Sequence, residues 1–271
     1  MTIETLNLPR PRWNVITATV VLHLGVLLAF LPGTFSWAAV GVAVFLHWVT
    51  LGLGITLGFH RLVSHRSFRA PKWLEYFLIL CGSLAGQGGV LGWVGFHRMH
   101  HRYSDQLQDP HDSTQGLWWS HISWLMHDVP MRTELEKYTQ DVSADPFYQF
   151  CHKHYILLQG ALAVVLYLIG GWPFVVWGTF VRLFFGFHCT CFVNSACHQW
   201  GYRTYDTGDR STNCWWVALV TYGEGWHNNH HAFQHSARHG LQWWEFDMTW
   251  WTIRGLEKLG IVSHVKSQGT H

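Results

Sequence analysis

Charged residues are scarce in this chain of 271 residues. Asp, Glu, Lys and Arg make up 13% of it, against about a quarter of an average soluble domain. Too few charges are present to cover an ordinary soluble surface, and a net charge of only +2 gives no indication of a nucleic-acid partner. The composition instead favours a membrane environment, and the 18 tryptophans are typical of proteins at the membrane–water interface.

Two familiar motifs are also absent, and each absence excludes a type of site. None of the six cysteines belongs to a C-x-x-C pair and several lie in apolar runs, so we expect buried, reduced thiols rather than disulfides. No H-E-x-x-H motif is present, which leaves a zinc protease of that type unsupported.

Long apolar runs are present in two pairs, and each pair is joined by a short turn that contains Gly and Pro. The runs cover about residues 15–31, 37–59, 155–170 and 174–194. Each run is close to the length of about 20 residues that a membrane-spanning helix needs. Neither turn carries Lys or Arg, whereas basic residues follow each hairpin, so the positive-inside bias places both termini in the cytoplasm. The sequence therefore predicts one all-α integral membrane domain over residues 1–271, with four transmembrane helices in two hairpins.

The apolar stretch at residues 73–96 is ambiguous, because six glycines and Gln87 interrupt it. If this stretch crossed the membrane, His65 and His97 would face opposite sides and could not share a site. We therefore expect it to enter or lie along the interface and return to the same side, covered by protein wherever its backbone is not helical. Residues 97–150 and 199–271 are predicted to form a cytoplasmic, histidine-rich cap with interfacial helices.

Histidines are abundant, and eight of them fall into three clusters. The segments His97–His101 and His227–His231 each hold three histidines at i, i+3 and i+4, which share one face of a helix. A looser pair, His60 and His65, lies upstream. Imidazole is a common ligand of zinc, copper and iron. Two identical triplets and a pair, in so apolar a chain, predict a metal centre.

A ninth candidate ligand, His198, lies at the end of the fourth apolar run, level with the other clusters. Cys191, Asn194 and His198 recur at helical spacing and share one face, with Asn194 one turn deeper than His198. Nine imidazoles are too many for one zinc ion, which takes three or four protein ligands. The set suits two metal ions with room for water or oxygen.

Four residues near the clusters are candidates for orienting the ligand imidazoles: Asp105, Asp109, His111 and Glu224. A soluble carboxylate di-iron bundle needs two Glu-x-x-His motifs, and this chain has one, Glu224–His227. Glu224 is therefore predicted to accept a hydrogen bond from a ligand rather than to bind metal. Asp105, Asp109 and His111 either serve likewise or are solvated loop residues.

Together these motifs resemble those of the integral-membrane fatty-acid desaturases, over about residues 15–261. The segments Gly58–His65, Asp109–His111 and Asn194–His198 are similar to the Δ9, stearoyl-type branch of that family. The segments Gly208–Trp216 and Trp226–Phe233 are similar to the cyanobacterial and bacterial acyl-lipid enzymes.

The resemblance implies a di-iron centre that activates O2 and leaves a cis double bond between C9 and C10 of a saturated acyl chain. In such enzymes nine histidines and a water held by an asparagine bind the irons. They correspond to His60, His65, His97, His100, His101, His198, His227, His230 and His231, with Asn194. The acyl chain lies in a narrow, bent tunnel, and the positions that form the bend correspond to Gln87, Trp93, Thr190 and Cys191.

The resemblance also implies partners and a location. Two electrons must come from outside, and the chain shows no haem motif of its own, so we expect a separate carrier docking on the cytoplasmic face. Ferredoxin fits the cyanobacterial likeness, with cytochrome b5 as the alternative. The substrate is expected to be a lipid-linked or CoA-linked acyl chain, in a plasma or thylakoid membrane.

Two alternatives stay open at this level. Membrane hydroxylases, ketolases and alkane mono-oxygenases carry similar histidine motifs and would yield an alcohol or ketone, although Gln87 and the Asn194–His198 segment favour a desaturase. A metal transporter would need polar residues along a path across the bilayer. Here the candidate ligands gather at one end, and Arg182 is the only strongly polar residue at depth.

Cys191 stands where the family commonly has tryptophan, so the smaller side chain is predicted to alter the shape of the tunnel at its bend. Cys191→Trp is expected to shift the position of the double bond or the preferred acyl chain length. Mass spectrometry of the lipids made by cells that express the variant measures both, and two unchanged values would refute a role for Cys191 in the tunnel.

Overall fold

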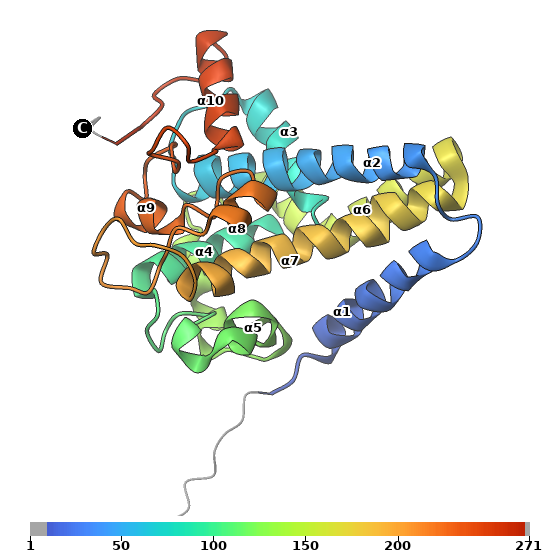
Figure 1. Ribbon diagram of the computed structural model, residues 1–271, viewed down its shortest axis with the longest axis horizontal. Helices are drawn as coiled ribbons and strands as arrows, with labels where there is room; N and C mark the ends of the chain where they lie inside the picture. Colours follow the sequence, from blue (N-terminus) through green and yellow to red (C-terminus); the bar gives the residue numbers. More distant parts are fainter. Residues whose placement is uncertain (1–9, 269–271) are drawn as a thin grey trace, which may run out of the picture.

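The computed structural model describes residues 10–268, and the secondary structure of these residues is helical apart from isolated β-bridges. Long helices run from one end of the molecule to the other, and short helices and loops gather at one end of them, on the left in Figure 1. The first and last described residues also lie toward that end (Figure 1). The predicted all-α class is confirmed for the described residues.

Three helices are long and apolar enough to cross a membrane: Trp13–Phe30, Trp37–Ser64 and Pro146–His198. Large apolar side chains on them are exposed, among them Phe30 at 82%, Trp37 at 79% and Leu168 at 77%. Contiguous apolar surface of this kind marks a face that something other than water covers. The exposed faces and the length of these helices support association with a membrane.

The third of these helices contains a break. It comprises α6 (Pro146–Val175), η6 (Val176–Val181), α7 (Arg182–Ser195) and η7 (Ala196–His198). The backbone leaves helical geometry at Gly170 and at Gly171, whose φ of 65° favours glycine. The chain reverses there, so that α6 and α7 run antiparallel (Figure 1). The break falls in the predicted turn, but the helix begins at Pro146, earlier than predicted, because Asp145 caps it by accepting a hydrogen bond from the Phe147 N–H at 2.9 Å.

The first two long helices form the other hairpin. The first comprises α1 (Trp13–Val26) and η1 (Leu27–Phe30), and the second comprises α2 (Trp37–His47) and η2 (Trp48–Ser64). The Ser36 hydroxyl caps α2 by accepting a hydrogen bond from the Ala39 N–H at 3.1 Å. The second helix continues past the predicted end at residue 59 as the π-helical segment η2. Such segments are rare and concentrate at functional sites, and this one carries His60.

The ambiguous stretch at residues 73–96 folds back on itself. It contains α3 (Lys72–Ser83) and the first part of α4 (Val90–Tyr103), joined by a turn in which Gly86 and Gly88 have positive φ. At the end of this stretch, His97 Nε2 lies 2.7 Å from His65 Nε2. The two histidines therefore lie on the same side, as the prediction of a shared site requires.

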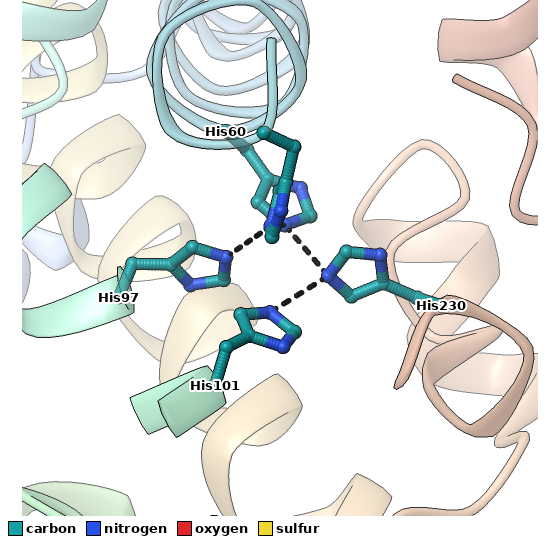
Figure 2. A group of neighbouring side chains, drawn as sticks. His60, His97, His101 and His230 are labelled. Atoms are coloured by element: carbon teal, nitrogen blue, oxygen red, sulfur yellow. Dashed lines mark hydrogen bonds between the residues drawn. The ribbon is translucent and has the colours of Figure 1, made fainter. Parts of the chain in front are cut away.

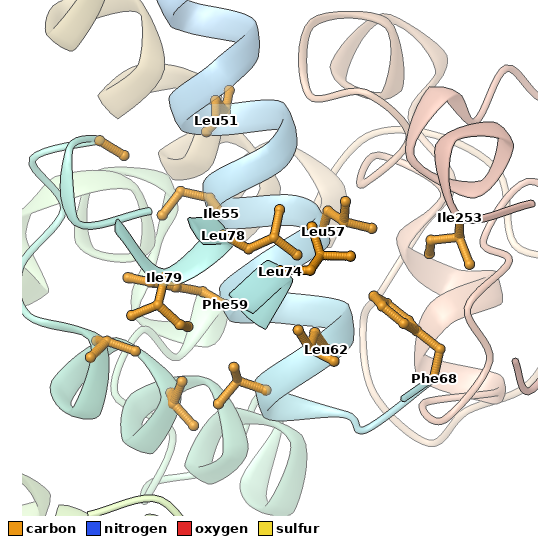
Figure 3. Packing of buried hydrophobic residues seen from close by; sticks show 14 of the residues in the cluster. Leu51, Ile55, Leu57, Phe59, Leu62, Phe68, Leu74, Leu78, Ile79 and Ile253 are labelled. Carbon is orange, nitrogen blue, oxygen red and sulfur yellow. The ribbon is translucent and has the colours of Figure 1, made fainter. Parts of the chain in front are cut away.

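The main hydrophobic core surrounds η2. Leu51, Ile55 and Phe59 of η2 pack against Leu78 and other buried side chains of α3 (Figure 3). Ile253 of α10 (Met248–Lys258) joins the same cluster. The remaining short helices are η3 (Ser113–Gln115), η4 (Trp119–Ser123), α5 (Trp124–Met126), η5 (Pro130–Tyr138), α8 (Trp215–Val220) and α9 (His227–Ala232).

Arg182, the polar residue at depth, is buried and bonded to neutral oxygens. Its guanidinium donates to Leu84 O at 2.7 Å, Thr50 Oγ1 at 3.0 Å and Gln159 Oε1 at 3.1 Å. It also donates to Gly178 O on its own helix at 2.6 Å. Among the described residues no carboxylate is recorded against it, so Arg182 joins the spans through neutral oxygens, which satisfy its buried guanidinium in an apolar layer.

Two isolated histidines of the apolar runs, His23 and His188, pair with one another outside the ligand groups. His23 Nε2 on α1 lies 3.1 Å from His188 Nε2 on α7, and His188 Nδ1 lies 3.0 Å from His121 Nε2 on η4. His121 Nδ1 in turn lies 2.9 Å from Ser195 Oγ. This chain of side chains connects α1, which has few buried residues, to α7.

A close approach of two backbones gives a test of the packing. A Cβ at Gly54 of η2 would lie 2.3 Å from Gly82 N of α3, whereas a Cβ at Gly41 of α2 would meet nothing within 4 Å. Gly54→Ala is expected to lower the free energy of unfolding by about 1–3 kcal/mol through overpacking. Gly41→Ala is the matched control and should be neutral or stabilising by up to about 1 kcal/mol. Thermal unfolding in detergent compares them, and equal effects would contradict the close approach.

Candidate metal centre

All nine predicted ligand imidazoles converge in two groups, and all are buried except His97 and His101, which are half-buried. The five-histidine group contains His60, His65, His97, His101 and His230, and the four-histidine group contains His100, His198, His227 and His231. Within each group the candidate ligand atoms all lie within 4.8 Å of one another. Figure 2 shows His60, His97, His101 and His230 turned toward one point from η2, α4 and α9.

Each histidine triplet is divided between the two groups. On α4, His97 and His101 turn to the five-histidine group and His100 to the four-histidine group. On α9 the division is reversed, because His230 joins the first group while His227 and His231 join the second. The i, i+3, i+4 spacing thus lets one helix face serve two adjacent sites, and α4 and α9 both contribute to each.

The separations between imidazole nitrogens fit ligands of a common ion. The Nε2 atoms of His60 and His230 are 3.1 Å apart, and those of His230 and His101 are 2.9 Å apart. In the other group, the Nε2 atoms of His227 and His198 are 3.2 Å apart. Two nitrogens each about 2.1 Å from one metal, and at right angles, would be separated by about 3 Å.

Four of these imidazoles contact a carboxylate through Nδ1, the ring nitrogen that faces away from the group. Asp109 and Asp105 provide two of these four contacts. His100 Nδ1 lies 2.8 Å from Asp109 Oδ2, and His198 Nδ1 lies 2.9 Å from Asp105 Oδ2. A neutral imidazole that donates from Nδ1 has its lone pair on Nε2. The inward Nε2 atoms are therefore hydrogen-bond acceptors that face one another without a donor between them. A cation bound between them would give each lone pair a partner. The donor set fits a pair of metal ions.

The other two carboxylates hold one ligand in each group. His231 Nδ1 lies 2.7 Å from Asp209 Oδ2, and His60 Nδ1 lies 2.6 Å from Glu224 Oε2. Burial by itself would raise the pKa of Asp209, but the hydrogen bond from His231 holds it below the ordinary value. Asp209 is therefore ionised at neutral pH and available as an acceptor.

Burial affects the protonation of several ligand imidazoles. Burial lowers the pKa of His97, His101 and His227 well below the ordinary value, and the neighbouring imidazoles lower it further. A lowered pKa means that protons leave these nitrogens well below pH 7 and do not compete there with a metal. We therefore expect metal binding to be lost only on acidification.

Glu224 is the centre of a buried ionic network. Arg61, which is completely buried, places Nη2 at 3.0 Å from Glu224 Oε1 and 2.9 Å from Asp247 Oδ1. Burial would raise the pKa of Glu224, but the neighbouring His60 and the charge of Arg61 hold it well below the ordinary value. His239 Nδ1 also lies 3.3 Å from Glu224 Oε2. The network keeps Glu224 ionised and fixed against His60.

The other predicted residues are placed around the two groups. The ring of His111 lies against that of His100 at a tilt of 35°, with 4.2 Å between centroids, and its Nδ1 lies 3.6 Å from Asp109 Oδ1. Asn194 lines a cavity whose wall also includes His60 and His227. The cavity therefore reaches ligands of both groups.

Three of the four residues predicted at the bend form one hydrogen-bonded unit at this cavity. The Gln87 amide donates to Thr190 Oγ1 at 2.8 Å, and the Trp93 indole N–H donates to Gln87 Oε1 at 3.2 Å. Trp93 and Thr190 line the cavity. Cys191 is buried, and its carbonyl accepts a hydrogen bond from Ser195 at 2.8 Å, but it is not among the residues that line the cavity.

Sequence reasoning missed four residues of this centre: Arg61, Asp209, His239 and Asp247. Arg61 and Asp209 lie inside segments that carried the family resemblance, so the motifs contained a signal for them. His239 and Asp247 stand outside every histidine motif, and only the packing of the segment after α9 brings them to Glu224 and Arg61.

Two adjacent all-histidine sites at the end of long apolar helices are what the sequence resemblance leads us to expect, and comparison with known proteins supports it. A family model described as fatty acid desaturase matches residues 35–264, and the chain belongs to that family of enzymes.

The relatives share most of their length with this chain. The chain is 59% identical over 266 residues to an sn-1 stearoyl-lipid 9-desaturase of Anabaena variabilis, covering 98% of both proteins. It is 49% identical to an sn-2 palmitoyl-lipid 9-desaturase of Nostoc sp. (strain 36), over 96% of this chain and 92% of the relative. It is also 47% identical to an icosanoyl-CoA 5-desaturase of Limnanthes douglasii, over 95% of this chain and 74% of the relative.

Asp209 offers a test of the carboxylate–histidine pairs, because Asp206 on the same loop is fully exposed and provides a matched control. Asp209→Asn is expected to weaken metal binding by about 10–100-fold, since His231 loses the acceptor that keeps its proton on Nδ1. Asp206→Asn should leave affinity unchanged. Competition with a chelator measures both, and equal affinities in the two variants would show that Asp209 does not orient His231.

Proposed function

We propose that the protein is an O2-dependent fatty-acyl Δ9 desaturase that introduces a cis double bond at a histidine-ligated di-iron centre. One observation carries the proposal: a cavity reaches two adjacent groups of imidazoles whose Nε2 atoms face inward. Imidazole suits iron among other metals, and the two groups provide five and four nitrogens.

The relatives support both the position of the new bond and the form of the substrate. Two of them are named as 9-desaturases of lipid-linked acyl chains, at 59% and 49% identity. The more distant relative at 47% is named for a CoA-linked chain and for position 5. We therefore infer a lipid-linked, saturated acyl substrate and attack at C9 and C10.

Bound irons would supply the O2 activation that breaks two unactivated C–H bonds. His60, His65, His97, His101 and His230 would hold one iron, and His100, His198, His227 and His231 the other, with Asn194 holding a water. The carboxylates of Glu224, Asp105, Asp109 and Asp209 keep the imidazole protons on Nδ1, and the ring of His111 supports His100.

The cavity would hold the reacting methylenes beside the centre. The Gln87, Thr190 and Trp93 unit fixes the polar side of the wall by mutual hydrogen bonds, so that these groups need no water. Leu51 and Ile55 provide apolar wall. Placement matters here, because small errors of position cost large factors in rate, and a site poor in water limits side reactions.

We further propose four transmembrane helices with both termini in the cytoplasm. The break at Gly170–Gly171 supports the fourth span, because an unbroken helix of 53 residues would be about 80 Å long, more than twice the apolar thickness of a bilayer. The turns of both hairpins are free of Lys and Arg. That charge pattern supports a cytoplasmic location for the histidine groups.

The reducing partner that we propose is a separate ferredoxin, with cytochrome b5 as the alternative. Forming one double bond from a methylene pair consumes O2, two electrons and two protons and releases two waters. The resemblance to cyanobacterial lipid desaturases supports ferredoxin as the donor.

Expression in a host that has no desaturase of its own tests the function. Mass spectrometry should find a double bond between C9 and C10 of host lipids, because the imidazole groups are intact. His101→Ala is expected to abolish the product by removing a ligand. His127→Ala is the matched control and should retain it, because His127 Nδ1 is bonded only locally, to Ser123 O at 2.7 Å.

An alcohol in place of the double bond would instead support a hydroxylase. An unchanged lipid profile, despite folded, iron-loaded protein and a competent electron donor, would overturn the assignment.

A further inference from the structure

The two histidine groups differ in their exposure. All four imidazoles of the four-histidine group are buried, whereas His97 and His101 of the five-histidine group are half-buried. Exposed residues also follow two members of the five-histidine group directly in the sequence, since Arg66 follows His65 and Arg102 follows His101. The five-histidine group is therefore the more accessible of the two to a molecule outside the protein.

The chain that follows η2 is joined to the segment that follows α10, at the cap end of the molecule (Figure 1). The Lys266 N–H donates to Ser67 O at 2.8 Å, and Lys266 O accepts from the Ala237 N–H, also at 2.8 Å. Arg69 and Ser263 exchange two backbone hydrogen bonds, at 2.7 and 2.9 Å. Three segments that are distant in the sequence thus bring Arg69 and Lys266 to the same part of the surface.

Helix α4 carries further cations on the face that meets this surface. Arg98 Nε donates to Ser64 O, at the end of η2, at 3.0 Å. Arg102 lies four residues after Arg98 and therefore on the same face of the helix. Asp141 is paired with Arg98, at 2.7 Å, and also with Arg66. A single carboxylate thus opposes two guanidiniums, and Arg102 adds a third cation.

This surface, the basic face, has an excess of positive charge. Seven Arg and Lys residues stand against three Asp and Glu residues in the segments that form it, which are residues 63–70, 97–104, 134–142, 233–239 and 261–268. Arg69, Arg102 and Lys266 are exposed, and their charged groups have no recorded hydrogen-bond or ion-pair partner among residues 10–268. The basic face can therefore attract an acidic partner.

The basic face also lacks the apolar side chains with which a protein inserts into lipid. In the five segments that form it, no large apolar side chain is exposed. Surfaces that bind a membrane interface combine Lys and Arg with Trp, Phe or Leu. Exposed side chains of that kind lie elsewhere, such as Trp73 on α3 and Trp251 on α10. Charge without apolar anchors favours a protein that docks briefly from water, as electron carriers do.

We propose that the basic face is the docking site of an acidic one-electron carrier protein, whose electrons enter the metal centre on the side of the five-histidine group. The inference rests on the proposed function, which requires such a carrier. Each docking oxidises one carrier by one electron, so two dockings supply the two electrons that one double bond consumes. Arg69, Arg102 and Lys266 position the carrier by charge and contact no substrate.

Binding of an acidic ferredoxin to the iron-loaded enzyme in detergent tests the basic face. The ferredoxin is used in its oxidised form, which has no electron to transfer, so that binding is measured without turnover. The triple variant Arg69→Glu/Arg102→Glu/Lys266→Glu is expected to weaken binding by about tenfold or more at low ionic strength, and the difference should shrink as salt screens the charges. Arg69→Lys/Arg102→Lys keeps all three charges and should retain most of the affinity.

Lys153→Glu on α6 is the matched control for Arg102→Glu, because each reverses one exposed charge that has no recorded partner among the described residues. Lys153 follows His152, which packs against Gly89 at the opposite end of α4 from the basic face. Arg102→Glu alone should weaken binding by about threefold, and Lys153→Glu should leave it unchanged.

Unaltered binding in the triple variant, or equal weakening by the two single reversals, would overturn the basic face as the docking site. Mass spectrometry of lipid that copurifies with the enzyme covers the other class of partner. Loss of anionic lipid from the triple variant, without a change in ferredoxin binding, would assign the face to lipid headgroups and overturn the proposal as well.

Kinetics with and without the carrier separate this inference from the function on which it rests. The triple variant should raise the KM for ferredoxin and change kcat little. In a single turnover with dithionite in place of the carrier, it should form as much product as the wild type. If wild-type enzyme reduced by dithionite forms the double bond but does not bind the ferredoxin, the proposed partner class is wrong and the function stands. If dithionite yields no double bond in the wild type, the desaturase function itself fails.

Discussion

The structure depends on carboxylates that keep protons on the outward-facing Nδ1 atoms of closely packed imidazoles. Taking so many polar rings out of water is unfavourable unless each finds a partner. Asp105, Asp109, Asp209 and Glu224 each take an Nδ1 contact between 2.6 and 2.9 Å, and this leaves the inward nitrogens with free lone pairs. The same carboxylates would carry negative charge close to two bound cations. This charge would lower the electrostatic free energy needed to bind two cations side by side.

The carboxylates are themselves held in place by different means. Glu224 is fixed from inside by Arg61, which is completely buried and shared with Asp247. Asp105 and Asp109 are fixed from outside, by backbone N–H groups of surface loops. The two metal-ligand groups consequently differ in their surroundings: the carboxylate of one is held by a buried ion pair, and two carboxylates of the other are held by the backbone of surface loops.

The long helices supply rigidity to this arrangement from the apolar side. The close approach of Gly54 to the backbone of α3 brings the end of η2 against the helix pair that carries His97. Arg182 joins η2, α6 and the end of α3 through neutral oxygens. A centre that must place an acyl chain accurately is thus built on helices whose relative positions are fixed by packing and hydrogen bonds.

The sequence by itself determined the all-helical class, the nine imidazoles and the family, because these depend on local periodicity and on motif spacing. It also indicated that His65 and His97 lie on the same side of the membrane. Only the tertiary structure decided how the triplets divide between two groups, since i, i+3 and i+4 lie on one face whichever metal they serve. The contacts of Asp247 and Arg182 were likewise decided there, because partners more than a hundred residues away, such as Arg61 for Asp247 and Thr50 for Arg182, meet only when the helices pack.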